Sequence, residues 1–193
     1  MSGIESGVNA AISQLETIEK GREAAMACSR RVIRLSKKVI HAIHDGEPVD
    51  EPLDQMRREL DAMKSHCSTP EVLMSGPVQD AMGEYAEAEI MSALASGDIV
   101  PDHIQLGIGA SPWIQGFCDC SGELRRMVMT RLAEGDLDGA KGVFSIMEEV
   151  HEEIQMLDVP DAIAPVRRKQ DIARGLMDKT RSEMTLASIM SVR

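Results

Sequence analysis

The sequence predicts an all-α protein, a single domain of seven helices that spans residues 1–193. Apolar residues recur at helical spacing along nearly the whole chain, and no stretch alternates apolar and polar residues as a half-buried strand would. Glycine and proline interrupt this pattern at intervals, without a long linker, an internal repeat or a low-complexity tract between the segments. Helices joined by short connections favour a compact bundle.

The first half of the chain holds three expected helices, over residues 7–44, 51–66 and 77–96. The segment Asp45-Gly46-Glu47-Pro48 ends the first helix, because glycine accepts left-handed backbone and proline lacks the N–H that an inner helical turn needs. Ser68-Thr69-Pro70-Glu71 has the composition of a helix cap with proline in the first turn.

The second half of the chain is expected to supply the other four helices. The first of them is short, and Asp136 is a suitable cap for the third, since aspartate commonly caps helix N-termini. The last begins after either Pro160 or Pro165. The expected ranges are 101–108, 111–134, 136–157 and from one of these prolines to about residue 191.

Composition indicates a globular protein with an unusual core. Hydrophobic residues make up 43% of the chain and charged residues 27%, which is ordinary for a soluble domain. Aromatics are only 2%, and there are 14 Met, so Met, Ala, Leu and Ile are expected to fill the core. No apolar run is long enough to span a bilayer, and no basic segment followed by an apolar one marks a secretory signal. We therefore expect a cytoplasmic protein that does not enter the membrane.

The four cysteines fit the same expectation. Their spacing matches neither a zinc ribbon nor a disulfide framework, which favours reduced thiols in a cytoplasm. A zinc site built from His66-Cys67 and Cys118-x-Cys120 has poor spacing. Glu148-x-x-His151 resembles half of the di-iron motif of helical bundles, but such proteins need the motif twice and this chain has it once.

Positive charge is concentrated in one segment of an acidic chain. The formal net charge is −11, yet residues 20–45 hold seven Lys or Arg and two acids, a local net charge of +5. Helical spacing aligns most of the basic residues as one stripe, which is then expected to contact the phosphates of a polyanion such as a nucleic acid, without sequence specificity. The alternative is a solvated face that pairs with acids of a neighbouring helix. The members of this basic stripe are Arg30, Arg34, Lys37, Lys38 and His41.

Four carboxylates on two expected helices carry the clearest chemistry. Glu84 and Glu87 are three residues apart, and Asp119 and Glu123 are four apart, so each pair shares one helix face. The second pair lies among apolar residues and is expected to point inward. Crowded carboxylates repel one another unless protons or a cation intervene, and oxygen ligands suit Mg²⁺ or Mn²⁺. That donor set is typical of metal-assisted phosphodiester hydrolysis. Solvated faces with intrahelical partners are the alternative.

Arg126 shares the face of Asp119 and Glu123, because it follows them by seven and three residues. Its guanidinium suits a bidentate contact to the scissile phosphate. A salt bridge to Glu123 explains the same spacing equally well. Few aromatic side chains are available to stack on bases, so backbone recognition is favoured over base recognition.

Three segments carry a resemblance to a known family. Glu84-Tyr85-Ala86-Glu87-Ala88 resembles Glu-Tyr-Val-Glu-Ala of the translin family, and residues 116–126 resemble its segment Gly-x-x-Asp-Leu-x-Gly-Glu-Leu-x-Arg. Residues 166–171, Val-Arg-Arg-Lys-Gln-Asp, are similar to its Leu-Arg-Arg-Lys-Tyr-Asp. The likeness covers nearly the whole chain in order, and is strongest to the branch of translin-associated factor X and its archaeal relatives.

This resemblance implies a fold, an assembly and an activity. Family members are seven-helix proteins that form hollow octamers, and the factor-X branch is a metal-dependent endoribonuclease. Glu84, Glu87 and Asp119 fall where that branch carries its catalytic acids, and Glu123 falls on the neighbouring metal-site glutamate. The expectation is a closed homo-octamer that uses Mg²⁺-activated water to cleave single-stranded or flexible RNA, with single-stranded DNA as a further candidate ligand. The alternatives are an RNA- or DNA-binding shell without turnover and a purely structural oligomer.

Overall fold

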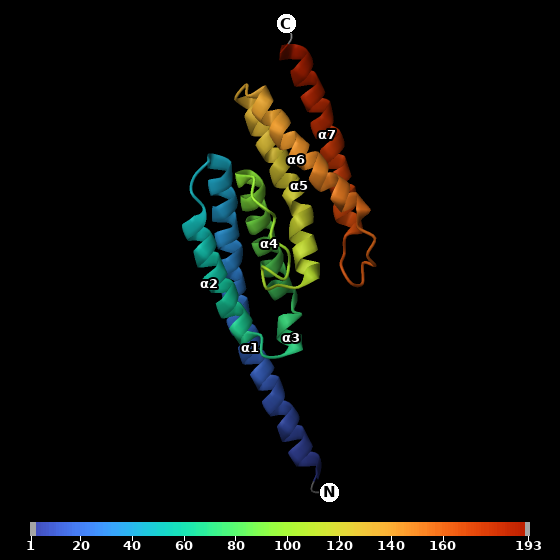
Figure 1. Ribbon diagram of the computed structural model, residues 1–193. Helices are drawn as coiled ribbons and strands as arrows, with labels where there is room; N and C mark the ends of the chain where they lie inside the picture. The colour runs from blue at the N-terminus through green and yellow to red at the C-terminus, as the bar shows by residue number, and fades with distance from the viewer. Residues whose placement is uncertain (1–2, 192–193) are drawn as a thin grey trace.

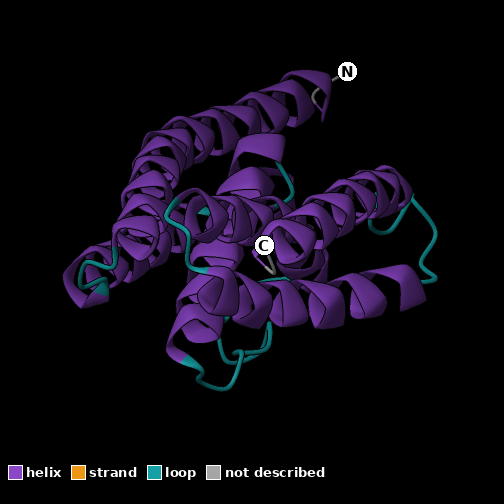
Figure 2. Cartoon of the chain, turned by 90° about the horizontal axis from the view of Figure 1, so that it is seen from above, coloured by secondary structure: helices purple, strands orange, loops and turns teal. Residues whose placement is uncertain are grey.

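The computed structural model describes residues 3–191, and Met1, Ser2, Val192 and Arg193 lie outside the described residues. Within that range the chain forms seven α-helices and no strand, which confirms the all-α prediction (Figures 1 and 2). The helices are α1 (Gly3–Asp45), α2 (Asp50–His66), α3 (Pro70–Leu73), α4 (Gly76–Ser96), α5 (Ala110–Ala133), α6 (Leu137–Met156) and α7 (Arg167–Ser191).

The prediction of a short helix over 101–108 is wrong. This segment forms turns, and the short helix is instead α3, which follows Thr69 and begins at Pro70. Side chains replace the missing helical hydrogen bonds, because the N–H of Asp102 donates to Oε1 of Gln105 and the N–H of Gln105 donates to Oδ1 of Asp102. Gly107, at φ +64, then turns the chain away toward α5. The last helix begins after Pro165, which settles the choice between the two prolines.

The helices pack in chain order around a core rich in methionine. Helices α1 and α2 lie side by side, α4 packs on α1 and on α5, and α6 and α7 cover the far side of α5 (Figure 1). The largest fully buried side chains include several methionines, as the low aromatic content predicted. They are Met56, Met63, Met91, Met147 and Met177.

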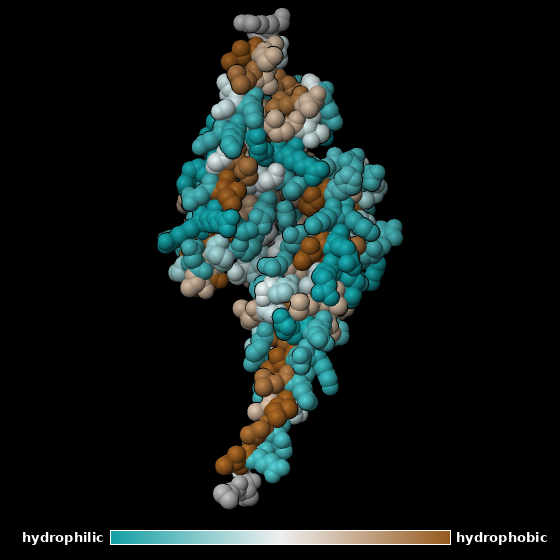
Figure 3. Space-filling view, turned by 180° about the vertical axis from the view of Figure 1, so that it is seen from behind, coloured by the Kyte–Doolittle hydropathy of each residue, from teal (hydrophilic) through white to brown (hydrophobic). Residues whose placement is uncertain are grey.

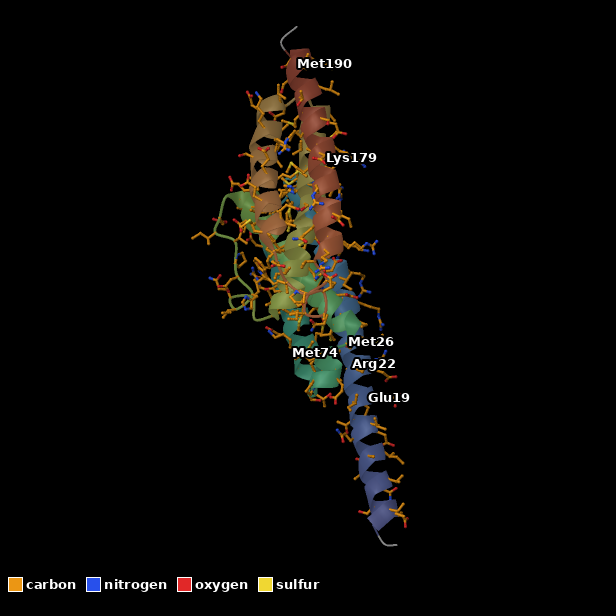
Figure 4. All side chains as sticks on the ribbon, turned by 90° about the vertical axis from the view of Figure 1, so that its right-hand side faces the viewer. Glu19, Arg22, Met26, Met74, Lys179 and Met190 are labelled. Atoms are coloured by element: carbon orange, nitrogen blue, oxygen red, sulfur yellow. The ribbon has the colours of Figure 1, made fainter. Side chains whose placement is uncertain are left out.

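The N-terminal part of α1 projects beyond this body (Figures 1 and 4). In Figure 4, Met26 lies where the helix reaches the body, whereas Glu19 lies on the projecting part. Apolar side chains follow one another along this arm, as the brown residues of Figure 3 show. The exposed members are Ile4, Val8, Ile12 and Leu15. None of the helices within residues 3–191 combines the length and the apolar character that crossing a membrane requires.

Candidate functional site

The site is built where α4 and α5 touch. Gly116 of α5 lies against the backbone of α4, and a Cβ at this position would meet the carbonyl oxygen of Gly83 and would lie 2.7 Å from the backbone nitrogen of Glu87. Only glycine allows the two helices to come this close. The contact places the α4 carboxylates beside those of α5.

All four predicted acids gather at this contact. Glu84 and Glu87 come from α4, and Asp119 and Glu123 come from α5. Burial, and after it the negative charges of Asp119, Glu84 and Glu123, together raise the pKa of Glu87 to about 8. The structure therefore brings together four acids from two helices, of which Glu84 and Glu123 are 39 residues apart in the sequence. Their negative charge is concentrated around Glu87.

The two acids of α5 have partners in the described chain. Lys169 of α7 donates to both oxygens of Asp119, at 2.6 and 2.5 Å, and to the carbonyl oxygen of Gln115 at 3.2 Å. Glu123 lies 2.6 Å from Nε2 of His44, which is almost fully buried. The expectation that this pair points inward holds only in part, because the Asp119 side chain is 49% exposed.

The two acids of α4 have no such partners. Within residues 3–191, no hydrogen bond or ion pair involves the carboxylate of Glu84 or Glu87. In the same range, no three His, Cys, Asp or Glu side chains stand close enough together to hold a metal ion. The donor set fits a hard divalent cation in kind. Its present arrangement does not, because Lys169 and His44 engage the carboxylates of Asp119 and Glu123.

The basic stripe lies exposed on α1. Within the described chain, Arg30, Arg34, Lys37 and Lys38 form no ion pair, and His41 lies 3.2 Å from Asp45 one turn later. The alternative of pairing with a neighbouring helix applies instead to Arg31, whose Nε donates to Glu59 of α2 at 2.7 Å. The stripe therefore presents cations that the described fold does not use.

One pocket joins the stripe to the acids. This acid pocket has a volume of about 300 Å³, and its wall combines basic side chains from α1 and α5 with carboxylates from α4 and α5. Arg126 lies in it with its guanidinium 3.7 Å from Glu123, a distance too long for a hydrogen bond. The charged residues that line the pocket are Lys37, His41, Glu84, Glu87, Glu123 and Arg126.

Two residues of the site had no role assigned from their sequence positions. Lys169 reaches Asp119 from α7, and His44 reaches Glu123 from the end of α1. Lys169 lies in one of the segments that carry the family resemblance, but the partners of Lys169 and His44 are 50 and 79 residues away, so local spacing could not pair them. Glu89, two residues after Glu87, is not part of the cluster and binds Arg57 of α2.

The other candidate motifs have structural roles. Glu148 pairs with Arg181 of α7 at 3.0 Å, and the four cysteines are free thiols in the structure. The Glu148-x-x-His151 motif therefore faces a cation on α7, and burial followed by the charge of Arg181 lowers the pKa of His151.

Comparisons with known proteins agree with this architecture. The model of the Translin family matches residues 64–180. An uncharacterized protein of Methanocaldococcus jannaschii is 27% identical over 181 residues, which cover 92% of this chain and 81% of that protein. The solved structure of AfC3PO is 29% identical, with a TM-score of 0.85 over 96% of this chain and 99% of that one.

Two further solved structures share the fold. The structure of an AfC3PO–duplex RNA complex gives the same identity and TM-score as AfC3PO alone, over 96% of this chain and 98% of that one. Apo-NeC3PO is 18% identical, with a TM-score of 0.81 over 93% of this chain and 96% of the other, and this likeness concerns the fold alone.

Proposed function

The chain belongs to the translin family, and we propose that it is a metal-dependent endoribonuclease that cleaves single-stranded or flexible RNA as a closed homo-octamer in the cytoplasm. The observation that carries the proposal is the acid pocket. It combines unpartnered carboxylates with basic side chains in one small cleft, as cleavage of a phosphodiester requires.

RNA is the proposed substrate because of the basic stripe and the solved relatives. Cations without protein partners are free to neutralise phosphates, and they contribute affinity that does not depend on sequence. A protein 29% identical to this chain was solved with duplex RNA. We propose a preference for flexible strands because a phosphate must enter a cleft of about 300 Å³ between α1, α4 and α5.

Each side chain of the pocket then has a proposed task. Lys37, His41 and Arg126 bind and orient the phosphates next to the cleaved bond. Glu84, Glu87, Asp119 and Glu123 would hold Mg²⁺ or Mn²⁺, which when bound neutralises charge on the phosphate and activates water. Asp119 would have to release Lys169 before it could serve as a ligand.

A non-catalytic RNA- or DNA-binding oligomer is the second candidate. The specific observation in its favour is that Lys169 and His44 engage half of the acidic set, and that no three possible metal ligands converge within the described residues. In such a protein the acids would serve the packing of α1, α5 and α7, and the basic stripe would bind nucleic acid without turnover.

The decisive experiment compares cleavage with binding. End-labelled single-stranded RNA is incubated with Mg²⁺ or with EDTA, using the wild-type protein, Glu87→Gln and the control Glu149→Gln, which makes the same change on an exposed part of α6. We expect internal cleavage only with Mg²⁺, a loss of at least about 100-fold in Glu87→Gln, and no change in the control.

Binding measured in EDTA separates the two candidates. RNA that is retained by all three proteins but never cut would reject the nuclease and leave the binding oligomer. Light scattering on the same samples tests the assembly, because a mass well below eight chains would reject the octamer.

A further inference from the structure

A second, larger pocket adjoins the acid pocket. It has a volume of about 640 Å³, and Glu84 lines both pockets. Asp119 and Lys169 form part of its wall, so it reaches the same carboxylates from another direction. The segment between α3 and α4, the start of α5 and Pro165 before α7 complete it. A molecule that occupies the acid pocket can therefore continue into this second pocket past Glu84.

The second pocket offers neutral hydrogen-bonding groups beside apolar surface. Gln79, Ser111 and Gln115 supply the polar groups. The amide nitrogens of the two glutamines donate to the carbonyl oxygens of Leu73 and Pro165, at 3.0 and 3.4 Å. No hydrogen bond within residues 3–191 uses their side-chain oxygens, which are therefore free to accept. The apolar wall consists of Ile33, Met74, Pro112 and Pro165.

The charge of the second pocket differs from that of the acid pocket. Its carboxylates are Asp80, Glu84 and Asp119. Among residues 3–191, the only lysine or arginine in its wall is Lys169, which Asp119 already binds. This wall repels a phosphate and attracts neutral groups that carry donors, such as hydroxyls and amino groups. The acid pocket also has three carboxylates, but it adds the basic side chains of Lys37, His41 and Arg126, which can bind a phosphate. The two pockets thus divide the chemistry of a nucleotide, with the phosphate on one side and the nucleoside on the other.

We propose that the second pocket is a nucleoside subsite, which takes the ribose and base of an unpaired nucleotide adjoining the phosphate in the acid pocket. This proposal rests on the proposed function, which identifies the bound strand as RNA. Ribose hydroxyls and base amino groups donate to the amide oxygens and carboxylates, while the base lies against Met74 and the prolines. The volume lies within the range of about 300–1,000 Å³ that is typical of small-molecule sites.

The subsite gives a physical reason for a preference for flexible RNA. A base in a duplex is stacked and paired, and moving it into a pocket costs the free energy of that stacking and pairing. An unpaired base enters without that cost. A duplex can still bind along the basic stripe through its phosphates. Only a strand that also places an unpaired base in the subsite is then positioned for cleavage.

Photo-crosslinking tests this placement without catalysis. Single-stranded RNA that contains 4-thiouridine is irradiated on the full-length protein in EDTA, and mass spectrometry maps the adducts. We expect adducts on the peptides that contain Met74, Gln79 or Ser111. The variant Ser111→Leu fills the pocket with an aliphatic group and should lower their yield about fivefold, whereas the exposed control Ser65→Leu should not. Adducts confined to α1, with equal yields in all proteins, would overturn the subsite.

A second variant guards against a folding defect in Ser111→Leu. The Met74 side chain is largely exposed, at 67% for the residue, so Met74→Ser leaves the core intact and removes apolar surface from the pocket (Figure 4). It should lower the same adducts about threefold at an unchanged melting temperature. Unchanged adducts in a stable Met74→Ser protein would count against the subsite as well.

A cleavage assay tests the subsite independently of crosslinking. In Mg²⁺, an abasic ribose at one position should slow cleavage of the adjoining bond about tenfold and leave distant bonds unaffected. Cleavage that ignores abasic positions, together with absent pocket adducts, rejects the subsite and keeps the nuclease. Pocket adducts without any cleavage keep the subsite and reject the nuclease.

Discussion

Two glutamates on α4, only two residues apart, have opposite electrostatic environments. Glu89 faces α2 and accepts two hydrogen bonds from Arg57, at 2.7 and 2.8 Å, with its side chain 7% exposed. Glu87 faces α5, is also mostly buried, and has three carboxylates around it. The residue type and the helix are shared, and Glu87 is only somewhat more exposed than Glu89, so the difference arises mainly from what the neighbouring helix presents.

This difference separates a structural charge, Glu89, from the charge for which we propose a function, Glu87. The Arg57–Glu89 pair links α2 to α4 and satisfies both charged groups, as folded proteins require of buried ions. The environment of Glu87 opposes ionisation and therefore costs stability when the group is charged. Packing elsewhere in the bundle must offset that cost, and such an arrangement is characteristic of sites that bind a ligand or a cation.

The largest expected effect comes from separating α4 from α5. In Gly116→Ala the new methyl group meets backbone atoms of Gly83 and Glu87, which cannot move alone, so we expect a loss of about 3 kcal/mol in the free energy of unfolding. Urea denaturation measures it. Gly122→Ala on the same helix is the control, because a Cβ there meets nothing within 4 Å and should stabilise by up to about 1 kcal/mol. Equal stability of the two variants would contradict the close contact.

Removing the partner of Glu89 tests the structural side of the comparison. Arg57→Met leaves a buried carboxylate without its counter-ion and should lower the free energy of unfolding by about 2–3 kcal/mol. The double variant Arg57→Met, Glu89→Leu should recover most of this loss. Arg58→Met, at the exposed neighbouring position, should change stability by less than about 0.5 kcal/mol. An Arg57→Met protein as stable as wild type would show that Glu89 does not need Arg57 as its counter-ion.

The pH dependence of stability tests the functional side. Glu87 has a pKa of about 8 in the folded chain and an ordinary value near 4.5 when unfolded, so the folded state holds a proton that the unfolded state releases between these values. Stability therefore falls as pH rises from about 4.5 to 8. Glu87→Gln should remove this component and be about 2 kcal/mol more stable than wild type near pH 8.5 in EDTA.

The matching experiment is a series of urea denaturations of wild type and Glu87→Gln at several pH values. Subtracting the free energy of unfolding of wild type from that of Glu87→Gln at each pH removes the contribution of the other titrating groups, which the two proteins share. A difference that does not grow with pH would mean that Glu87 is already compensated in the folded protein.

The smallest expected effect is on RNA affinity, and it concerns the basic residues of α1, where a paired and an unpaired arginine can be compared. Arg34 is exposed and without an ion pair in the described chain, whereas Arg31 binds Glu59. Arg34→Met should weaken RNA binding about threefold and reduce the salt dependence by about one phosphate contact. Arg31→Met should leave RNA affinity unchanged. Fluorescence anisotropy at several salt concentrations provides the measurement, and equal losses in both variants would argue against a defined stripe.

Most helix boundaries could be predicted because they depend on a few adjacent residues. Helix α1 ends at Asp45, directly before Gly46, whose φ is +68°. At the start of α6, the side chain of Asp136 accepts a hydrogen bond from the N–H of Gly139 at 2.9 Å. The segment 101–108 was mispredicted for an equally local reason. Its apolar spacing suits a helix, but the reciprocal bonds of Asp102 and Gln105 satisfy the backbone in a turn.

By itself the sequence determined the order of the main helices, the methionine-rich core, the exposed basic stripe and the presence of two carboxylates on one face of each of two helices. All of these follow from periodicity and spacing within one helix. Only the tertiary structure decided that the two acidic pairs meet, that Lys169 and His44 engage Asp119 and Glu123, and that Glu89 turns to Arg57. Those contacts join residues of different helices, and the close approach at Gly116 that permits the first of them is set by packing, which no local pattern encodes.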